Sequence, residues 1–258
     1  GFNMEELIQL APMVSNRKFG VGADGLIVLA EPNIDDGTTD LDYTMIYRNA
    51  DGSDAGMCGN GARCIALYAR QRGYGKVQNF NVHEREYRAR IVGENEVEIE
   101  FSLTAGIEEH TVNGHDLLVV NPGTEHVVEK VDREVLENES YLRDTGRYLR
   151  EHSHFQPIGT NVNFFCGTDS DELLLQTYER GVEDLTLACG TGAIASALAW
   201  HHMQDSAGTG DGDTHRCHVQ VKGGTLTVEF AYDAAAERYS DIKLKGPAHF
   251  VFEGKINL

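Results

Sequence analysis

Basic residues are scarce in this sequence. The chain has 22 Lys and Arg against 41 Asp and Glu, which gives a formal charge of −19. A chain with this charge repels the phosphates of nucleic acids and of anionic lipids, so we expect neither a nucleic-acid partner nor a membrane partner. The acidic residues are spread along the chain, as in 94–100 (ENEVEIE), which is typical of a solvated surface. Such a halophilic-like acidic surface indicates a high-salt cytoplasm, where self-repulsion is screened.

Long apolar runs are missing as well. No stretch reaches the ~20 consecutive apolar residues that a membrane-spanning helix needs, and no basic-then-apolar leader opens the sequence. We therefore expect a cytoplasmic protein. With 258 residues, 41% of them hydrophobic, the chain can form one large domain or two small ones. The cysteines make an odd set without an export signal, so free thiols are expected at Cys58, Cys64, Cys166, Cys189 and Cys217.

Hydrophobic patterning predicts more strands than helices. Apolar residues alternate, as they do in strands, at 43–47, 97–103, 117–120, 173–178 and 226–230. Apolar residues have helical spacing at 4–14, 61–71 and 192–203. The balance favours an α+β fold.

The sequence also repeats itself weakly. A shift of 131 positions, without a gap, places Tyr47 on Tyr178 and Cys58 on Cys189, and matches of glycine, alanine and leucine follow each cysteine. This pattern predicts two similar, pseudo-symmetric domains, each a curved and mostly antiparallel sheet around one central helix. The alternative is a chance match between two glycine-rich helix starts.

We place the domain boundaries from this repeat. Residues 1–110 together with 247–258 are expected to form an N-terminal domain that carries Cys58. Residues 111–246 are expected to form a C-terminal domain that carries Cys189. The first domain would then be discontinuous, because the end of the chain returns to complete it.

Each repeat contains a cysteine turn that opens a helix, at 57–64 (MCGNGARC) and at 188–195 (ACGTGAIA). A helix N-terminus has unpaired backbone N–H groups and about half a positive charge, so it attracts anions. Glycines on both sides of Asn60 and Thr191 allow a ligand to approach the backbone closely. The same field is expected to lower the pKa of each cysteine thiol from about 8.5 toward neutrality.

Two such turns that face each other would hold one carboxylate, with a sulfur on either side of the adjacent carbon. One sulfur could then remove a proton from one face while the other returns a proton to the opposite face. The carbanion would spread its charge onto the carboxylate oxygens, which the N–H groups stabilise. This arrangement predicts inversion at an amino-acid Cα without pyridoxal phosphate, and hence no cofactor.

Other interpretations of the two turns remain open. The cysteines could be small buried apolar residues, as most free cysteines are. The helix ends could also form a non-catalytic site for a phosphate or a dicarboxylate, although binding alone requires only N–H groups. Finally, Cys58 and Cys189 could form a disulfide when oxidised, which we would expect to inactivate an enzyme of this kind.

The motifs strongly resemble the diaminopimelate epimerase family, whose members interconvert LL- and meso-diaminopimelate in lysine and peptidoglycan biosynthesis. The resemblance covers most of the chain, through segments 17–29, 48–64, 159–164, 178–193 and 246–256. It implies an isomerase with diaminopimelate as substrate, and it also implies a homodimer. Proline racemase and the phenazine-pathway isomerase are neighbours that share the fold by resemblance. A proline racemase would not need Arg180 for a distal carboxylate, and the isomerase type lacks the cysteine pair.

The resemblance also implies roles for individual residues. Cys58 and Cys189 are the two bases, and His126 and Glu179 lie near them as further catalytic residues, with Glu179 also binding the substrate ammonium. The substrate-binding positions are Asn49, Gly59, Asn60, Thr124, Asn161, Glu179, Arg180, Gly190 and Thr191. Arg180 suits a distal carboxylate because its guanidinium can bind both oxygens.

Three features depart from the family pattern. Members normally begin with a strand that carries HGxGNDF or QGTGNDF, whose asparagine contacts substrate, whereas this sequence opens at GFNMEEL, as expected of a truncated or processed form. Thr124, in 123–126 (GTEH), replaces the asparagine of GNPH and has less reach. Gly25 stands where other members carry glutamine.

Two further motifs carry no function in this interpretation. The segment 20–25 (GVGADG) matches a dinucleotide-binding pattern but follows polar residues and precedes a predicted strand, so we expect a turn. The segment 215–218 (HRCH) lacks the paired spacing of a zinc site, so we expect a polar loop and no metal.

Overall fold

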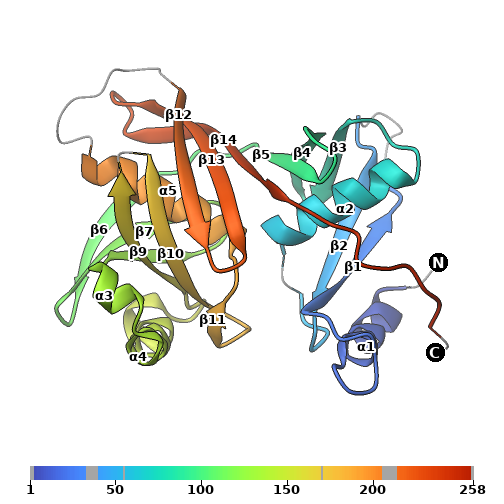
Figure 1. The fold of residues 1–258 in the computed structure, drawn as a ribbon, viewed down its shortest axis with the longest axis horizontal. Coiled ribbons are helices and arrows are strands. Elements are labelled where there is room, and N and C mark those ends of the chain that lie inside the picture. The colour runs from blue at the N-terminus through green and yellow to red at the C-terminus, as the bar shows by residue number, and fades with distance from the viewer. Residues whose placement is uncertain (1–2, 33–39, 55, 170, 205–213, 257–258) are drawn as a thin grey trace.

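The computed structural model describes residues 3–32, 40–54, 56–169, 171–204 and 214–256. Two lobes lie side by side and share one 14-stranded sheet (Figure 1). The predicted α+β class is confirmed. Most neighbouring strands are antiparallel, and each lobe curves its part of the sheet around one helix.

In its described residues, the N-terminal lobe contains two helices and five strands. In chain order these are α1 (Met4–Ser15), β1 (Gly25–Ala30), β2 (Tyr43–Asn49), α2 (Gly59–Gln71), β3 (Val77–Val82), β4 (Arg85–Ile91) and β5 (Glu96–Phe101). The predicted helices at 4–14 and 61–71 correspond to α1 and α2. Residues 20–24 form a non-helical loop that leads into β1 at Gly25, so this segment does not open a helix as a dinucleotide-binding motif would.

The C-terminal lobe is larger. Its elements are β6 (Ile107–Val112), β7 (His115–Val120), β8 (His126–Lys130), α3 (Arg133–Leu136), α4 (Glu139–Glu151), η1 (Ser153–Phe155), β9 (Asn161–Asp169), β10 (Glu172–Glu179), β11 (Asp184–Thr186), α5 (Gly190–Gln204), β12 (Thr214–Val221), β13 (Gly224–Asp233) and β14 (Arg238–Pro247).

The strand order shows an internal repeat. The order β1-β2-β3-β4-β5 is followed, in reverse, by β14-β13-β12-β10-β9, so the two sets of strands are related about the β5–β14 pair. In both sets the strand after the helix is parallel to the strand before it, β3 to β2 and β12 to β10. The predicted pseudo-symmetry of the fold is therefore confirmed, and β8, β7 and β6 extend the sheet beyond the repeat in the C-terminal lobe only.

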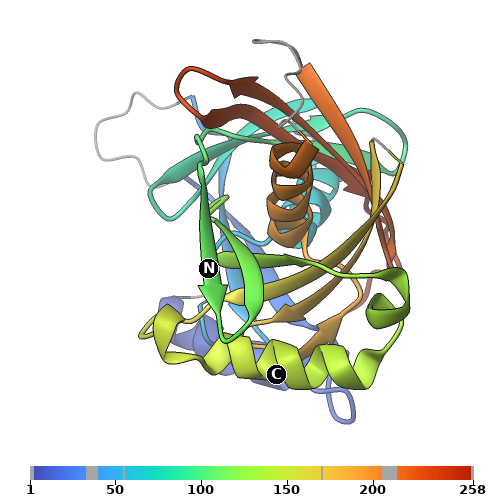
Figure 2. The ribbon, with the colours of Figure 1, turned by 90° about the vertical axis from the view of Figure 1, so that its left-hand side faces the viewer.

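The two central helices are buried because their residues are small. Every residue of α5 from Gly190 to Ala199 is buried, and α2 buries eight of its thirteen residues. Figure 2 shows the strands of the C-terminal lobe curving around α5. Small side chains let the sheet approach the helix on all sides. The sheet thereby fixes the direction and the depth of each helix N-terminus.

The last described segment of the chain returns to the N-terminal lobe (Figure 1). The backbone N–H of Ala248 donates to Asn95 O at 2.9 Å, and Arg72 Nη2 lies 3.8 Å from Glu253 Oε1. These contacts agree with a discontinuous first domain, whose boundaries at 110/111 and 246/247 stay a prediction. Residues 1–2, 33–39, 55 and 257–258 of that predicted domain lie outside the described residues.

Two local interpretations of the sequence were wrong or incomplete. The HRCH segment lies in β12, not in a polar loop, and its Cys217 is buried under the sheet. The helix α4 was missed because only four of its residues are buried, and two of those, Thr145 and Gly146, are not strongly apolar. Within the described residues, none of the helices has the length and hydrophobicity to cross a membrane.

Candidate active site

The N-termini of α2 and α5 meet end to end where the two lobes join (Figure 1). The first residue of each helix is a glycine, and the two glycines pack backbone against backbone. A methyl group on Gly59 would lie 3.2 Å from Gly190 Cα, and one on Gly190 would lie 3.1 Å from Gly59 Cα. A side chain at either position would crowd the facing backbone, so glycine suits this close approach. The positive ends of two helices therefore point into one region, as the turn motifs predict.

Each helix is preceded by one of the paired cysteines. Cys58 is the N-cap of α2, and its Sγ accepts a hydrogen bond from the backbone N–H of Gly61 at 3.4 Å. Cys189 directly precedes α5, and its Sγ lies 3.7 Å from Thr191 Oγ1. Cys58 is partly buried and Cys189 is buried. All five cysteines are free, so the prediction of free thiols is confirmed.

The predicted lowering of the two thiol pKa values is wrong for this structure. Burial raises the pKa of Cys58 and of Cys189, because a thiolate loses its hydration there, and the nearby Glu179 carboxylate raises both further. Backbone N–H groups of the turns lower the two pKa values, as predicted, but burial outweighs them. Both sulfurs are therefore neutral thiols near pH 7 in this state.

Glu179 is the last residue of β10 and influences both thiols from one position. Burial raises the pKa of this carboxyl group, and the charge of Asp24 raises it too. A partly buried carboxylate of this kind gains stability from a cationic ligand. The structure thus brings Glu179 and both cysteine turns together.

The ring nitrogens of His126 contact Thr124, Thr191 and Asn163, and the histidine thereby holds the Thr191 side chain. Thr177 Oγ1 donates to Asn163 Oδ1 at 2.9 Å, which orients the Asn163 amide so that its Nδ2 donates to His126 Nδ1 at 3.0 Å. The imidazole proton must then be on Nε2, which lies 3.0 Å from Thr191 Oγ1. With its oxygen occupied in this way, the Thr191 hydroxyl can donate toward Cys189 or toward a bound carboxylate.

His126 is held in its neutral form. It is fully buried, and burial lowers the pKa of His126 to about 3, with a further contribution from the positive charge of Arg180. A histidine that stays neutral at physiological pH suits a positioning role for Thr191, and the further catalytic role that the resemblance implies stays a prediction.

We expect this buried histidine to make folding pH-dependent. Because the pKa of His126 falls from 6.5 in the unfolded chain to about 3 in the folded protein, stability is complete above pH 6.5 and falls as the pH decreases toward 3. Between about pH 7 and about pH 5 the unfolding free energy should fall by about 2 kcal/mol more in the wild type than in His126→Gln. Denaturant unfolding at both pH values measures the difference.

The matched control for this prediction is His202→Gln. His202 is partly exposed and pairs with Glu109 at 3.1 Å on the surface. Its replacement should leave the wild-type pH dependence in place. Identical slopes for the wild type and His126→Gln would contradict the prediction.

Asn60 is held by a different arrangement from that of Thr191. Its Oδ1 accepts from Arg63 Nη2 at 2.8 Å, and its Nδ2 donates to Ala188 O at 2.9 Å. The second bond joins the α2 turn to the opposite lobe. Arg63 is nearly buried and also donates to Pro247 O at 3.2 Å, so one guanidinium braces the turn against the returning chain end. The Asn60 side chain is therefore engaged, and its turn offers a ligand mainly backbone N–H groups.

A second group of predicted residues lies beside the turns and forms a distal cluster. The backbone N–H of Arg180 donates to Asn161 Oδ1 at 2.9 Å, and Arg180 Nη1 donates to Ile158 O at 3.0 Å. Asn49, at the end of β2, approaches from the other lobe, with its Nδ2 4.0 Å from where a Cβ on Gly181 would lie. The structure thus brings Asn49, Asn161 and Arg180 together across the junction of the lobes.

Thr124 contacts residues of the α5 turn network. Its Oγ1 is 3.0 Å from His126 Nε2 and 3.4 Å from Thr191 Oγ1. The role of Thr124 in substrate binding, which the resemblance implies, stays a prediction. The hydroxyl joins the network that holds Thr191.

Sequence reasoning missed several residues of the site. Arg63 and Asn163 hold the two turns. Both lie inside motifs of the family, but nothing in the sequence indicated that their side chains support the turns. Tyr47 was noticed only as a repeat match, but burial and the charges of Cys58 and Glu179 raise its pKa, which places it beside the thiols. Its position two residues before Asn49 on β2, and so on the same face of the strand, could have indicated this.

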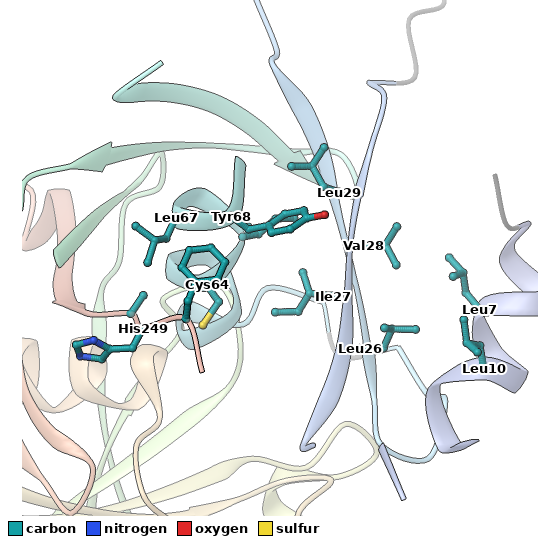
Figure 3. Close-up of a pocket in the computed structure, with 13 residues that line it drawn as sticks. Leu7, Leu10, Leu26, Ile27, Val28, Leu29, Cys64, Leu67, Tyr68 and His249 are labelled. Carbon is teal, nitrogen blue, oxygen red and sulfur yellow. The ribbon is translucent and has the colours of Figure 1, made fainter. Parts of the chain in front are cut away.

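A cavity of about 470 Å³ lies elsewhere, in the N-terminal lobe between α1, β1 and α2 (Figure 3). Leucine, isoleucine and valine side chains line most of it, and Cys64 is the one cysteine among its lining residues. None of the predicted catalytic or substrate-binding residues lines this cavity. It is therefore separate from the polar site at the junction of the lobes.

Comparison of the chain with solved structures identifies its fold. A phenazine biosynthesis protein of the PhzF family from Bacillus anthracis superposes with a TM-score of 0.71 over 100% of this chain and 90% of that chain, at 12% sequence identity. A hydroxyproline epimerase from Agrobacterium vitis superposes with a TM-score of 0.67 over 93% of this chain and 77% of that chain, at 13% identity. The chain shares the fold of these proteins.

Sequence comparison identifies the family. The model of the diaminopimelate epimerase family matches residues 1–101 and 110–251. The diaminopimelate epimerase of Flavobacterium psychrophilum is 36% identical, over 96% of this chain and 89% of that protein. That of Aquifex aeolicus is 35% identical, over 92% of this chain and 81% of that protein. The chain belongs to the diaminopimelate epimerase family, which confirms the resemblance.

Proposed function

We propose that this protein interconverts LL- and meso-diaminopimelate by proton transfer at one Cα between Cys58 and Cys189, without a cofactor. Family membership supports the reaction. The observation that carries the mechanism is the close packing of Gly59 on Gly190, which points two cysteine-bearing helix N-termini into one site. A binding protein would need the N–H groups of such turns but not a sulfur at each of them.

The backbone of the two turns holds the substrate carboxylate next to the reacting carbon. Amide N–H groups at the starts of α2 and α5 stabilise the negative charge that develops on the carboxylate oxygens as the α-proton leaves. Gly59, Asn60, Gly190 and Thr191 supply this cradle, and the Thr191 hydroxyl, oriented by His126, adds a donor.

Glu179 binds the substrate α-ammonium. The ammonium offsets the carboxylate charge that raises both thiol pKa values, so substrate binding favours the formation of one thiolate. That thiolate takes the α-proton and becomes a thiol. The opposite thiol gives its proton to the other face of the carbanion and becomes the thiolate, so the number of protons is unchanged and the two sulfurs have exchanged roles.

The other substrate end lies in the distal cluster in this proposal. Arg180 binds the distal carboxylate, and Asn49 and Asn161 supply amide groups on either side. Asn161 also fixes the Arg180 backbone through its Oδ1, at 2.9 Å from the Arg180 nitrogen. By the same resemblance we propose that the protein acts in the cytoplasm, as a homodimer, in lysine and peptidoglycan biosynthesis.

Proton exchange in deuterated buffer tests the proposed function. Full-length reduced protein should replace the α-proton of LL-diaminopimelate by deuterium, because a proton carried by sulfur exchanges with solvent, and the loss of the α-proton signal can be followed by NMR. The meso isomer should appear in parallel. Tight binding of LL-diaminopimelate without any exchange would replace this proposal by that of a binding protein.

A further inference from the structure

Arg180 has a carboxylate partner from its own chain. Arg180 Nη1 lies 3.2 Å from Glu125 Oε2, and the two side chains are 28% and 37% exposed. Both are thus partly open to solvent, where an ion pair adds little to stability. Glu125 belongs to the segment 123–126 (GTEH) and was not among the residues that the sequence indicated. The stability of the fold therefore does not explain why this ion pair lies here.

Glu125 is built into the distal cluster by its backbone. The Glu125 carbonyl accepts from the Asn161 backbone N–H at 3.0 Å and from Asn161 Nδ2 at 3.1 Å. The Oδ1 atom of the same asparagine accepts a hydrogen bond from the Arg180 backbone N–H. Asn161 therefore fixes the positions of a cationic and an anionic residue relative to each other.

Each member of the pair has unused hydrogen-bonding capacity. The hydrogen bonds of the Arg180 side chain go through Nη1, to Glu125, Ile158 and Gly159, and within the described residues neither its Nη2 nor its Nε has a hydrogen-bond partner. Glu125 Oε1 has only a long contact of 3.5 Å, from Asn121 Nδ2. A donor edge and an acceptor atom thus remain available side by side.

These two groups complement a zwitterion. The distal carbon of diaminopimelate carries a carboxylate and an ammonium group, whereas the distal end of a simple dicarboxylate carries only the carboxylate. We infer that Glu125 is a specificity-determining residue, whose Oε1 accepts from the distal ammonium while Arg180 binds the distal carboxylate. The pair then selects substrates with an amino acid at the distal end. This inference rests on the proposed function.

Glu125→Gln tests the inference, because it removes the charge, keeps the shape and leaves both Asn161 bonds to the backbone. LL-Diaminopimelate is the first probe, and L-2-aminopimelate, which lacks the distal amino group, is the second, used as a competitive inhibitor. In Glu125→Gln the KM for LL-diaminopimelate should rise about tenfold or more, since a charged hydrogen bond is lost, with little change in kcat. The inhibition constant of L-2-aminopimelate should stay within about twofold.

Glu137→Gln is the matched control, because it removes a carboxylate that pairs with an arginine at 3.3 Å on the exposed surface. It should change neither constant. Equal changes of both constants in Glu125→Gln would overturn the inference, and so would a lower KM for LL-diaminopimelate, which would make Glu125 a competitor of the substrate. If the wild type exchanges no α-proton of LL-diaminopimelate, the proposed function fails instead, and the inference fails with it.

Discussion

Cys189→Ala and Cys58→Ala should each abolish inversion of LL-diaminopimelate. Removal of either sulfur leaves one face of the substrate carbon without an acid or a base, and the contribution of such a group is on the order of 10² to 10⁴ in rate. Because the proposed mechanism requires both positions in each turnover, we expect a loss of at least about 10³ in kcat. Production of the meso isomer, followed by NMR, measures it.

Cys64→Ala provides the control for both variants. Cys64 lies on α2, but it is exposed and lines the apolar cavity, not the junction of the lobes. Its replacement should leave kcat within about twofold of the wild type. A Cys58→Ala or Cys189→Ala protein that folds and still inverts at a tenth of the wild-type rate would exclude the two-sulfur mechanism.

Gly190→Ala should lower kcat, although Gly190 has no side chain that could take part in the reaction. The added methyl would lie 2.9 Å from Leu244 Cδ2 and 3.1 Å from Gly59 Cα, so the two helix starts must move apart. Overpacking of this kind costs about 1–3 kcal/mol in unfolding free energy. A shift of about 1 Å between reacting groups can lower the rate about 10²-fold. We therefore expect kcat to fall about a hundredfold. The unfolding free energy should fall only by the cost of overpacking, about 1–3 kcal/mol.

Gly254→Ala is the control, because a methyl group there meets nothing within 4 Å. Thermal unfolding and kcat should both stay close to the wild type. Wild-type kcat in Gly190→Ala would show that the spacing of the two helix starts is not important for the reaction.

Much of the fold could be predicted because short segments of the sequence show the repeat. The small residues that follow Cys58 and Cys189 indicate helices that a sheet can surround, and these are α2 and α5. The sequence contains no local signal for the joining of the lobes through β5 and β14. That pairing brings Leu244 opposite Ile99, and such distant contacts leave no pattern in a single sequence.

The sequence predicted which residues form the site, but not how deeply they are buried or how burial changes their pKa values. The motifs indicated both thiols, Glu179 and Arg180, and the structure brings these residues to the junction of the lobes. The pKa of Cys189 was predicted in the wrong direction, because the helix N-terminus is visible in the sequence whereas burial arises from the whole fold. Glu125 was missed for a similar reason, since its partner Arg180 is 55 positions away.

The near-twofold relation about β5 and β14 matches the geometry of the reaction itself. Reactant and product differ by reflection at a single carbon, so a catalyst for both directions benefits from two half-sites that are almost interchangeable. The two half-sites are nevertheless braced differently, since Arg63 holds the turn before α2 and His126 holds Thr191 in the turn before α5. The duplicated scaffold thus supplies two matching helix starts, and a different side chain holds each of them in place.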